Sequence, residues 1–204
     1  MRKLIYVPVV HTSADMGSLA KSLKNEFLDK FGKDSWDQQV DAINDMWSGI
    51  REKIFSMNLN YPSVKVYQDG LPLCGKEIDI VKDVATKGSL NYRIVLELIE
   101  KGAKLIGTED AELLIKEYNY IKELINEQDD KKMEEKAQNY KKDRDKLLVK
   151  RDKFIATQID KTLQEGETGI LFIGIIHNID KYLPKDIEIS YLIYRLPFVK
   201  ESAA

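Results

Sequence analysis

The clearest periodic pattern in the chain lies between Trp36 and Met57, where hydrophobic side chains recur at alternating spacings of four and three residues. This spacing predicts a helix with one buried face. The hydrophobic positions of that face are Trp36, Val40, Ile43, Trp47, Ile50, Ile54 and Met57. A second apolar stripe over residues 16–31 predicts a preceding helix, and Gly32 is the residue at which we expect that helix to end.

Short apolar runs rich in β-branched residues predict strands. These runs are 3–10, 63–68, 103–107, 169–176 and 187–196. Two short helices, 76–87 and 90–101, are predicted between the second and third runs. Strands that alternate with helices indicate an α/β fold with a mostly parallel central sheet of about five strands flanked by helices. We therefore treat residues 1–204 as a single α/β domain.

A long segment without helix breakers precedes the fourth strand, because no glycine or proline occurs between Gly107 and Gly166. One straight helix of that length would extend about 87 Å. We therefore predict that residues 111–165 fold back as a helical hairpin. The break is placed between Asn126 and Asp130, where hydrophobic residues are missing. Charges of both signs fill this long charged helical hairpin, and such a pattern favours a solvated face. A homodimer formed through the charged helices is the alternative.

Composition excludes several classes of protein without naming a function. Lys and Arg number 32 against 34 Asp and Glu, so the chain has no basic excess for binding nucleic acid. The single cysteine, Cys74, excludes an internal disulfide and a cysteine-based zinc site. No apolar run approaches the roughly 18 residues of a membrane span, and no cleavable signal peptide is evident. We expect a cytoplasmic protein.

Side chains capable of chemistry follow the predicted strands. The two histidines of the chain, His11 and His177, follow the first and fourth strands, while Asp69 ends the second strand and Glu109 follows the third. Ligands of open α/β sheets bind at the carboxyl ends of the strands, so these side chains are expected at one edge. Two imidazoles with a carboxylate can hold a divalent metal ion, or act as acid and base without one.

The C-terminal part of the chain resembles a known family. It has an Arg151-Asp152 pair, a helix, and a strand that ends in Gly-Ile-Ile-His at 174–177. This order is similar to the closing motif of the TraB/Tiki branch of the erythromycin esterase/ChaN-like superfamily. The first motif of that family, Gly-x-x-His, corresponds here to Pro-Val-Val-His at 8–11, and Asp69 stands where the family usually has glutamate.

The resemblance implies a hydrolase site that uses both histidines, since the superfamily includes metal-dependent proteases, lactone-cleaving esterases and haem- or iron-binding proteins. We expect a metal-assisted hydrolase of a small-molecule or peptide substrate. His11 and His177, with Glu109 or Asp69, would hold Mn²⁺, Co²⁺ or Zn²⁺, which lowers the pKa of a bound water. Arg151 would stabilise developing negative charge or bind an acidic group of the substrate.

Three alternatives stay open beside this expectation. In a metal-free variant, one histidine takes a proton from water and Arg151 binds the oxyanion. A non-catalytic protein of the same fold could use the site to hold a small ligand, a metal or haem. An interaction protein would work through the charged helices of 111–165. In the catalytic cases we expect His11 and His177 on the same edge of the sheet and Arg151 directed into that edge.

Overall fold

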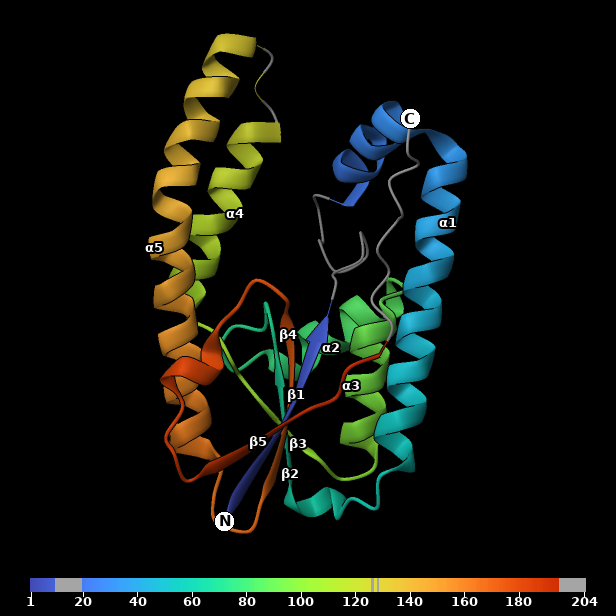
Figure 1. Cartoon of the computed structure of the whole chain (residues 1–204), viewed down its shortest axis with the longest axis vertical. Coiled ribbons are helices and arrows are strands. Elements are labelled where there is room, and N and C mark those ends of the chain that lie inside the picture. Colours follow the sequence, from blue (N-terminus) through green and yellow to red (C-terminus); the bar gives the residue numbers. More distant parts are fainter. Residues whose placement is uncertain (10–19, 126, 128, 195–204) are drawn as a thin grey trace.

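The computed structural model describes residues 1–9, 20–125, 127 and 129–194. These residues form an α/β fold around a five-stranded sheet in the order β3-β2-β4-β1-β5, with every pair of neighbours parallel (Figure 1). The strands are β1 (Arg2–Val9), β2 (Val64–Gln68), β3 (Lys104–Ile106), β4 (Thr168–Gly174) and β5 (Ile187–Tyr191). The predicted fold class is confirmed.

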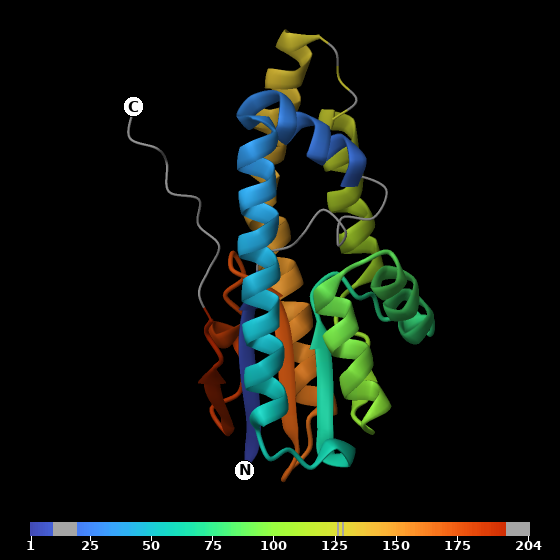
Figure 2. The same ribbon diagram turned by 90° about the vertical axis from the view of Figure 1, so that its right-hand side faces the viewer.

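Helices cover both faces of the sheet. They are α1 (Ala20–Ser56), α2 (Glu77–Thr86), α3 (Leu90–Glu100), α4 (Ala111–Ile125) and α5 (Asp130–Thr162). Helices α1, α2 and α3 pack on one face, and the second half of α5 packs on the other (Figures 1 and 2). None of the helices within the described ranges combines the length and the apolar character that crossing a membrane requires.

Alternating side chains of the strands divide the core into two layers. Ile5 and Val7 of β1 lie in the layer under α1 and α3, whereas Leu4 and Tyr6 lie in the layer under α5. Residues with this period of two are buried on both sides of the sheet, which explains why the strands read as continuous apolar runs. Pro8 of β1 lies beyond the last pair with β5 and is in register only with β4, so its missing N–H costs no ladder bond on the β5 side.

The predicted stripe of α1 forms much of the first layer. Trp47, Ile50 and Ile54 are buried, and the ring of Trp47 lies 6.4 Å from that of Phe172 in β4. Gly32 has φ 78° and ψ 172°, a backbone conformation that interrupts the helix. The prediction that a helix ends at Gly32 is therefore confirmed as a bend between two helical parts.

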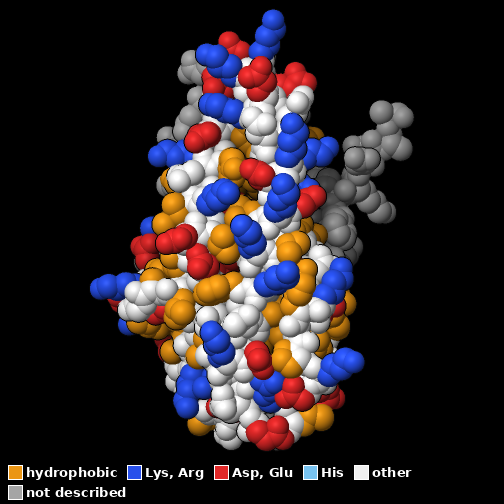
Figure 3. Space-filling view, turned by 90° about the vertical axis from the view of Figure 1, so that its left-hand side faces the viewer, with side chains coloured by type: hydrophobic (Ala, Val, Ile, Leu, Met, Phe, Trp, Pro, Cys, Tyr) orange, Lys and Arg blue, Asp and Glu red, His pale blue; other side chains and the backbone are white. Residues whose placement is uncertain are grey.

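Helices α4 and α5 form the predicted hairpin and extend beyond the carboxyl ends of the strands (Figure 1). Asp129 caps α5 by accepting hydrogen bonds from the backbone N–H groups of the second and third residues after it. Side chains of both charges are interspersed on the outer surface of the hairpin (Figure 3). The apolar positions of the hairpin predict that Leu114, Tyr118, Ile121 and Ile159 pack toward the body. In the structure Ile159 is buried and Leu114 and Ile121 are half-buried, but Tyr118 is 38% exposed.

Two predicted strands are shorter in the structure. Strand β4 ends at Gly174 instead of 176, because the next two residues form a turn that the N–H of His177 closes on the carbonyl of Gly174 at 3.0 Å. Strand β5 ends at Tyr191, where its pairing with β1 stops, and residues 195 and 196 of the predicted strand lie outside the described part.

The order of the strands determines where a ligand site is expected. Strand β2 continues through α2 and α3 to β3 at one end of the sheet, whereas β4 continues to β5 at the other end. The connections that follow the neighbouring strands β2 and β4 therefore run to opposite ends of the sheet, which makes the crevice between the carboxyl ends of these two strands a topological switch point. Asp69 follows β2 and His177 follows β4 at this crevice.

The packing of α5 on the sheet gives a testable prediction. Ile159 is fully buried between α5 and the strands, so Ile159→Ala should lower the free energy of unfolding by about 2–5 kcal/mol through lost burial and a cavity. Ile115 of α4 is 58% exposed, and Ile115→Ala should change the same quantity by less than about 0.5 kcal/mol. Urea denaturation measures both; equal losses in the two variants would contradict the described core.

Candidate functional site

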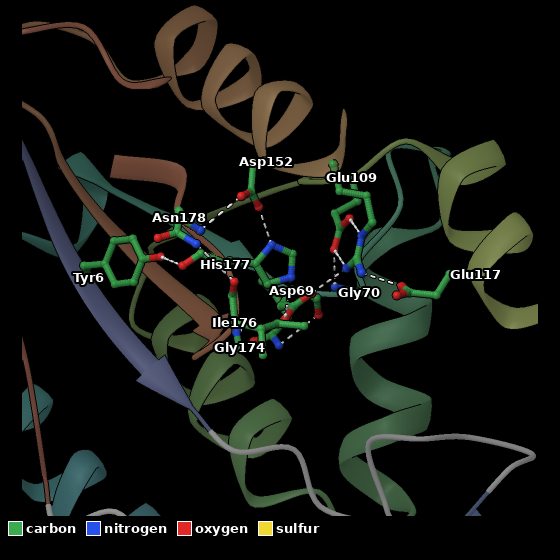
Figure 4. A network of polar contacts seen from close by, with 12 residues as sticks. Tyr6, Asp69, Gly70, Glu109, Glu117, Asp152, Gly174, Ile176, His177 and Asn178 are labelled. Carbon is green, nitrogen blue, oxygen red and sulfur yellow. Dashed lines mark hydrogen bonds and ion pairs between the residues drawn. The ribbon is translucent and has the colours of Figure 1, made fainter. Parts of the chain in front are cut away.

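Six polar side chains meet at the carboxyl ends of β2, β3 and β4, and Figure 4 labels all of them except Arg151. They are Asp69, Glu109, Glu117, Arg151, Asp152 and His177, which we call the edge cluster. All except Glu117 are buried. Asp69, Glu109 and His177 lie in connections that follow strands, whereas the other three lie inside α4 and α5. Buried polar groups need partners, and the contacts within the cluster supply them.

Asp69 joins the ends of β2 and β4. Its N–H donates to the carbonyl of Phe172 at 2.9 Å, and its Oδ2 accepts from the N–H of Gly174 at 2.9 Å. Its carbonyl accepts from Nε2 of Gln68 at 3.1 Å and from the hydroxyl of Tyr92 in α3 at 3.5 Å. The carboxylate is therefore held in one place from both its backbone and its side chain.

His177 lies between two carboxylates. Its Nδ1 is 2.5 Å from Oδ1 of Asp152, whose Oδ2 accepts from the N–H of Asn178 at 3.0 Å. Since a carboxylate can only accept, Nδ1 carries the hydrogen of this bond. Nε2 then carries the lone pair in the neutral ring, and it points toward Oδ2 of Asp69 at 3.6 Å, which is too long for a direct hydrogen bond (Figure 4).

Arg151 binds three carboxylates with its three nitrogens. Nε donates to one oxygen of Glu109 at 2.6 Å, and Nη2 donates to the other oxygen at 2.6 Å and to Oδ1 of Asp69 at 2.9 Å. Nη1 donates to Glu117 of α4. The expectation that Arg151 is directed into the edge is confirmed, and its partners there include Asp69 and Glu109. Its neighbours Lys150 and Lys153 are exposed.

The electrostatics of the cluster are dominated by burial and by the excess of carboxylates. Burial raises the pKa of Glu109 to about 7; the charge of Asp69 acts in the same direction, while the hydrogen bonds from Arg151 lower it. For Arg151, burial alone lowers the pKa, but the carboxylates of Glu109, Asp69 and Glu117 outweigh it and raise the pKa above its ordinary value. The guanidinium therefore stays charged.

The apolar stripe of α5 explains why Arg151 and Asp152 reach the edge. Leu147, Ile155 and Ile159 are buried at successive spacings of eight and four residues, and Arg151 lies halfway between the first two. Arg151 lies well inside α5 instead of opening it, because the helix continues past the edge of the sheet. Ile155 packs on the sheet, and Arg151, one helical turn before it on the same face, therefore lies where the strands end.

Two members of the cluster were not among the predicted site residues. Asp152 was noted only as part of the Arg-Asp pair within a charged run, and Glu117 was not singled out. Both carry a signal in the sequence, since they interrupt apolar stripes: Asp152 precedes the buried Ala156 by four residues, and Glu117 lies between Leu113 and Tyr120. A charged residue in line with buried positions indicates a polar partner inside.

The predicted metal set is only partly described. His11 lies outside the described residues, so its proximity to His177 stays a prediction. Both oxygens of Glu109 bind Arg151, and one of them also accepts from the N–H of Gly70 at 2.8 Å, so Glu109 is not directed at His177 as a ligand. Within the described ranges, no three His, Cys, Asp or Glu side chains converge as metal ligands. The described residues alone do not fit a metal ion.

The contacts of Arg151 predict the effect of its substitution on stability. Arg151→Lys removes the paired donors that Glu109 and Asp69 share, so buried carboxylates lose partners and the free energy of unfolding should fall by about 1–3 kcal/mol. Arg144 is an exposed arginine of the same helix, and Arg144→Lys is the matched control with no expected loss. Thermal and urea denaturation compare them; an unchanged Arg151→Lys variant would refute the network.

Glu109 should make stability depend on pH. Its folded pKa of about 7 lies above the ordinary value of 4.5, so the folded protein holds a proton that the unfolded chain releases between these pH values. The contribution of Glu109 to the free energy of unfolding is therefore lost as pH rises from 4.5 to 7, by at most about 1.4 kcal/mol per pH unit. Glu109→Gln removes this group and should flatten the decline.

Urea denaturation at a series of pH values tests this expectation. The exposed Glu188 supplies the control Glu188→Gln, whose curve should run parallel to that of the wild type. If the Glu109→Gln curve also ran parallel to the wild type, the buried carboxyl would not titrate as described.

Comparisons of the chain with protein-family models, with curated proteins and with solved structures found no match. The similarity to the TraB/Tiki branch therefore stays a prediction. The function has to be argued from the geometry of the edge cluster.

Proposed function

We propose that the chain is a hydrolase in which His177 acts as the general base at the carboxyl edge of the sheet. The observation that supports this proposal is the 2.5 Å contact between Nδ1 of His177 and Asp152, which fixes the ring and leaves Nε2 as the proton acceptor. Asp152 is itself held by the N–H of Asn178 at 3.0 Å. A base oriented by a buried carboxylate is a recurring arrangement in enzymes that activate water or a hydroxyl.

The 3.6 Å separation between Nε2 of His177 and Oδ2 of Asp69 is suited to a bridging water. Such a water donates one hydrogen to each atom, and its lone pair is available for attack. His177 takes the proton as the water oxygen forms a bond to the carbonyl carbon of the substrate. The tetrahedral intermediate then breaks its bond to the leaving group, which receives the proton from His177.

In this proposal Arg151 is a positioning residue. Each of its three nitrogens already donates to a carboxylate, so the guanidinium holds Asp69 and Glu109 in place. Binding an oxyanion or an acidic group of the substrate, as expected from the sequence, would require Arg151 to leave these partners. The N–H of Gly174 and Arg151 together orient the carboxylate of Asp69 toward His177.

A metal-assisted route remains a second form of the same proposal. Nε2 of His177 and Oδ2 of Asp69 are the two described atoms that could share an ion with His11. Elemental analysis of protein purified without chelator, repeated on His11→Ala and His177→Ala, tests it. Stoichiometric Mn, Co or Zn that is lost in both variants would favour the metal, and its absence from the wild type would favour the metal-free route.

Non-catalytic binding of a small ligand is the alternative function, and one observation favours it. The side chain of His177 is only 2% exposed, so a substrate has to reach a nearly covered ring. Turnover of a substrate distinguishes the two functions, because a binding protein would saturate without forming product.

Hydrolysis of p-nitrophenyl acetate, a small generic ester, provides the first measurement. Asp152→Asn removes the acceptor that fixes the ring, and His177→Gln removes the base, so kcat/KM should fall by about 10²–10⁴-fold in each. Asp145 is an exposed aspartate on the same helix, and Asp145→Asn should retain the wild-type rate. Equal rates in all four proteins would exclude His177 as the base.

A further inference from the structure

The turn that connects β4 to His177 exposes two large apolar side chains. Ile175 is 49% exposed and Ile176 is 58% exposed, at the two central positions of the turn. Central positions of turns are usually occupied by glycine, proline or small polar residues, so two adjacent isoleucines are not explained by turn formation. Because they are about half exposed, they contribute little to the core and are available for contact with another molecule.

This turn is held firmly beside the candidate base. The N–H of Gly174 donates to Asp69 at 2.9 Å, and the N–H of His177 donates back to the carbonyl of Gly174 at 3.0 Å. The two isoleucines therefore lie one and two residues before His177, in a turn that is held at both of its ends. A group that binds to this turn is bound at the carboxyl end of β4, from which His177 follows.

The neighbouring loop adds a third apolar side chain to the same edge. Leu73 follows β2, is 52% exposed, and its N–H donates to the carbonyl of Glu109 at 2.8 Å. A Cβ at Gly107 would lie 2.7 Å from the Cα of Leu73, so the glycine allows this loop to lie close over the end of β3. Leu73 therefore lies on the β3 side of the edge, and we call the two isoleucines of the turn, Ile175 and Ile176, the apolar rim.

The charge of the edge cluster excludes anionic ligands. Four carboxylates face one guanidinium and one imidazole, and negative charge remains even when His177 is charged and Glu109 is protonated. A phosphate or carboxylate at this position would be repelled, and the nitrogens of Arg151 already donate to carboxylates of the chain. The charge therefore disfavours an anion, and the apolar rim favours an uncharged group over a hydrated cation.

From the exposed isoleucines and the negative charge of the edge cluster we infer that the substrate is an uncharged ester whose apolar chain lies on the apolar rim. The inference rests on the proposed hydrolase function. We place the apolar chain of the ester on the isoleucines because the turn that exposes them also contains Gly174 and His177. Each methylene removed from water on the rim should raise kcat/KM by about fourfold until the rim is covered.

A series of p-nitrophenyl esters from acetate to hexanoate tests the chain-length dependence. In the wild type kcat/KM should rise with each methylene, and mono-p-nitrophenyl succinate, which carries a carboxylate, should react more slowly than the butanoate ester. The double variant Ile175→Ser/Ile176→Ser should lower the hexanoate-to-acetate ratio toward one. Ile193, 57% exposed beyond β5, supplies the control Ile193→Ser, which should keep the wild-type ratio.

A second measurement does not depend on turnover. The δ1-methyl signals of the two isoleucines can be assigned by NMR with Ile175→Val and Ile176→Val. Hexanol, an uncharged alkyl probe, should shift these signals in a saturable way, whereas methanol should not.

The two measurements separate the inference from the function on which it rests. Shifted methyl signals without hydrolysis of any ester would overturn the hydrolase proposal and keep the apolar rim as a binding surface. Hydrolysis with no dependence on chain length would overturn the inference and keep the hydrolase. Methyl signals that hexanol leaves unmoved would overturn the inference in either case.

Discussion

The ion pairs of Arg151 are the interaction on which the site depends. This buried guanidinium joins α5 to Asp69 after β2 and to Glu109 after β3, and it also reaches Glu117 of α4. Breaking a buried pair leaves an uncompensated charge, which makes each partner dependent on the others. The arrangement fixes the hairpin against the sheet edge, and Asp152, the next residue along α5, is thereby brought to His177.

An excess of carboxylates around one guanidinium is an unfavourable arrangement for stability alone. Buried ion pairs rarely stabilise a fold better than apolar residues of the same volume, and Glu109 also has a pKa raised by burial. Side chains with perturbed pKa values in a topological switch point are typical of functional sites. The position of the cluster and its chemistry therefore both support its interpretation as a functional site.

Periodicity explains how much of this structure could be predicted from the sequence. The strands and the stripe of α1 were predictable because their burial follows local spacing, and Asp69, Glu109 and His177 were predictable as residues that follow strands. The contact between Asp152 and His177 was not predictable, because it depends on the position of α5 along the sheet. The end of β4 was also hidden, since the apolar run continues through Ile175 and Ile176 into the turn.

One structural variable, the register of α5, then controls both halves of the site. Successive helical residues differ by about 100° in direction and 1.5 Å in height, so Arg151 and Asp152 reach different strands from one turn of helix. A shift of one residue would turn both side chains away and would also move Ile155 and Ile159 out of the core. The apolar stripe and the charged pair therefore select the same register, and the packing that stabilises the fold also assembles the site.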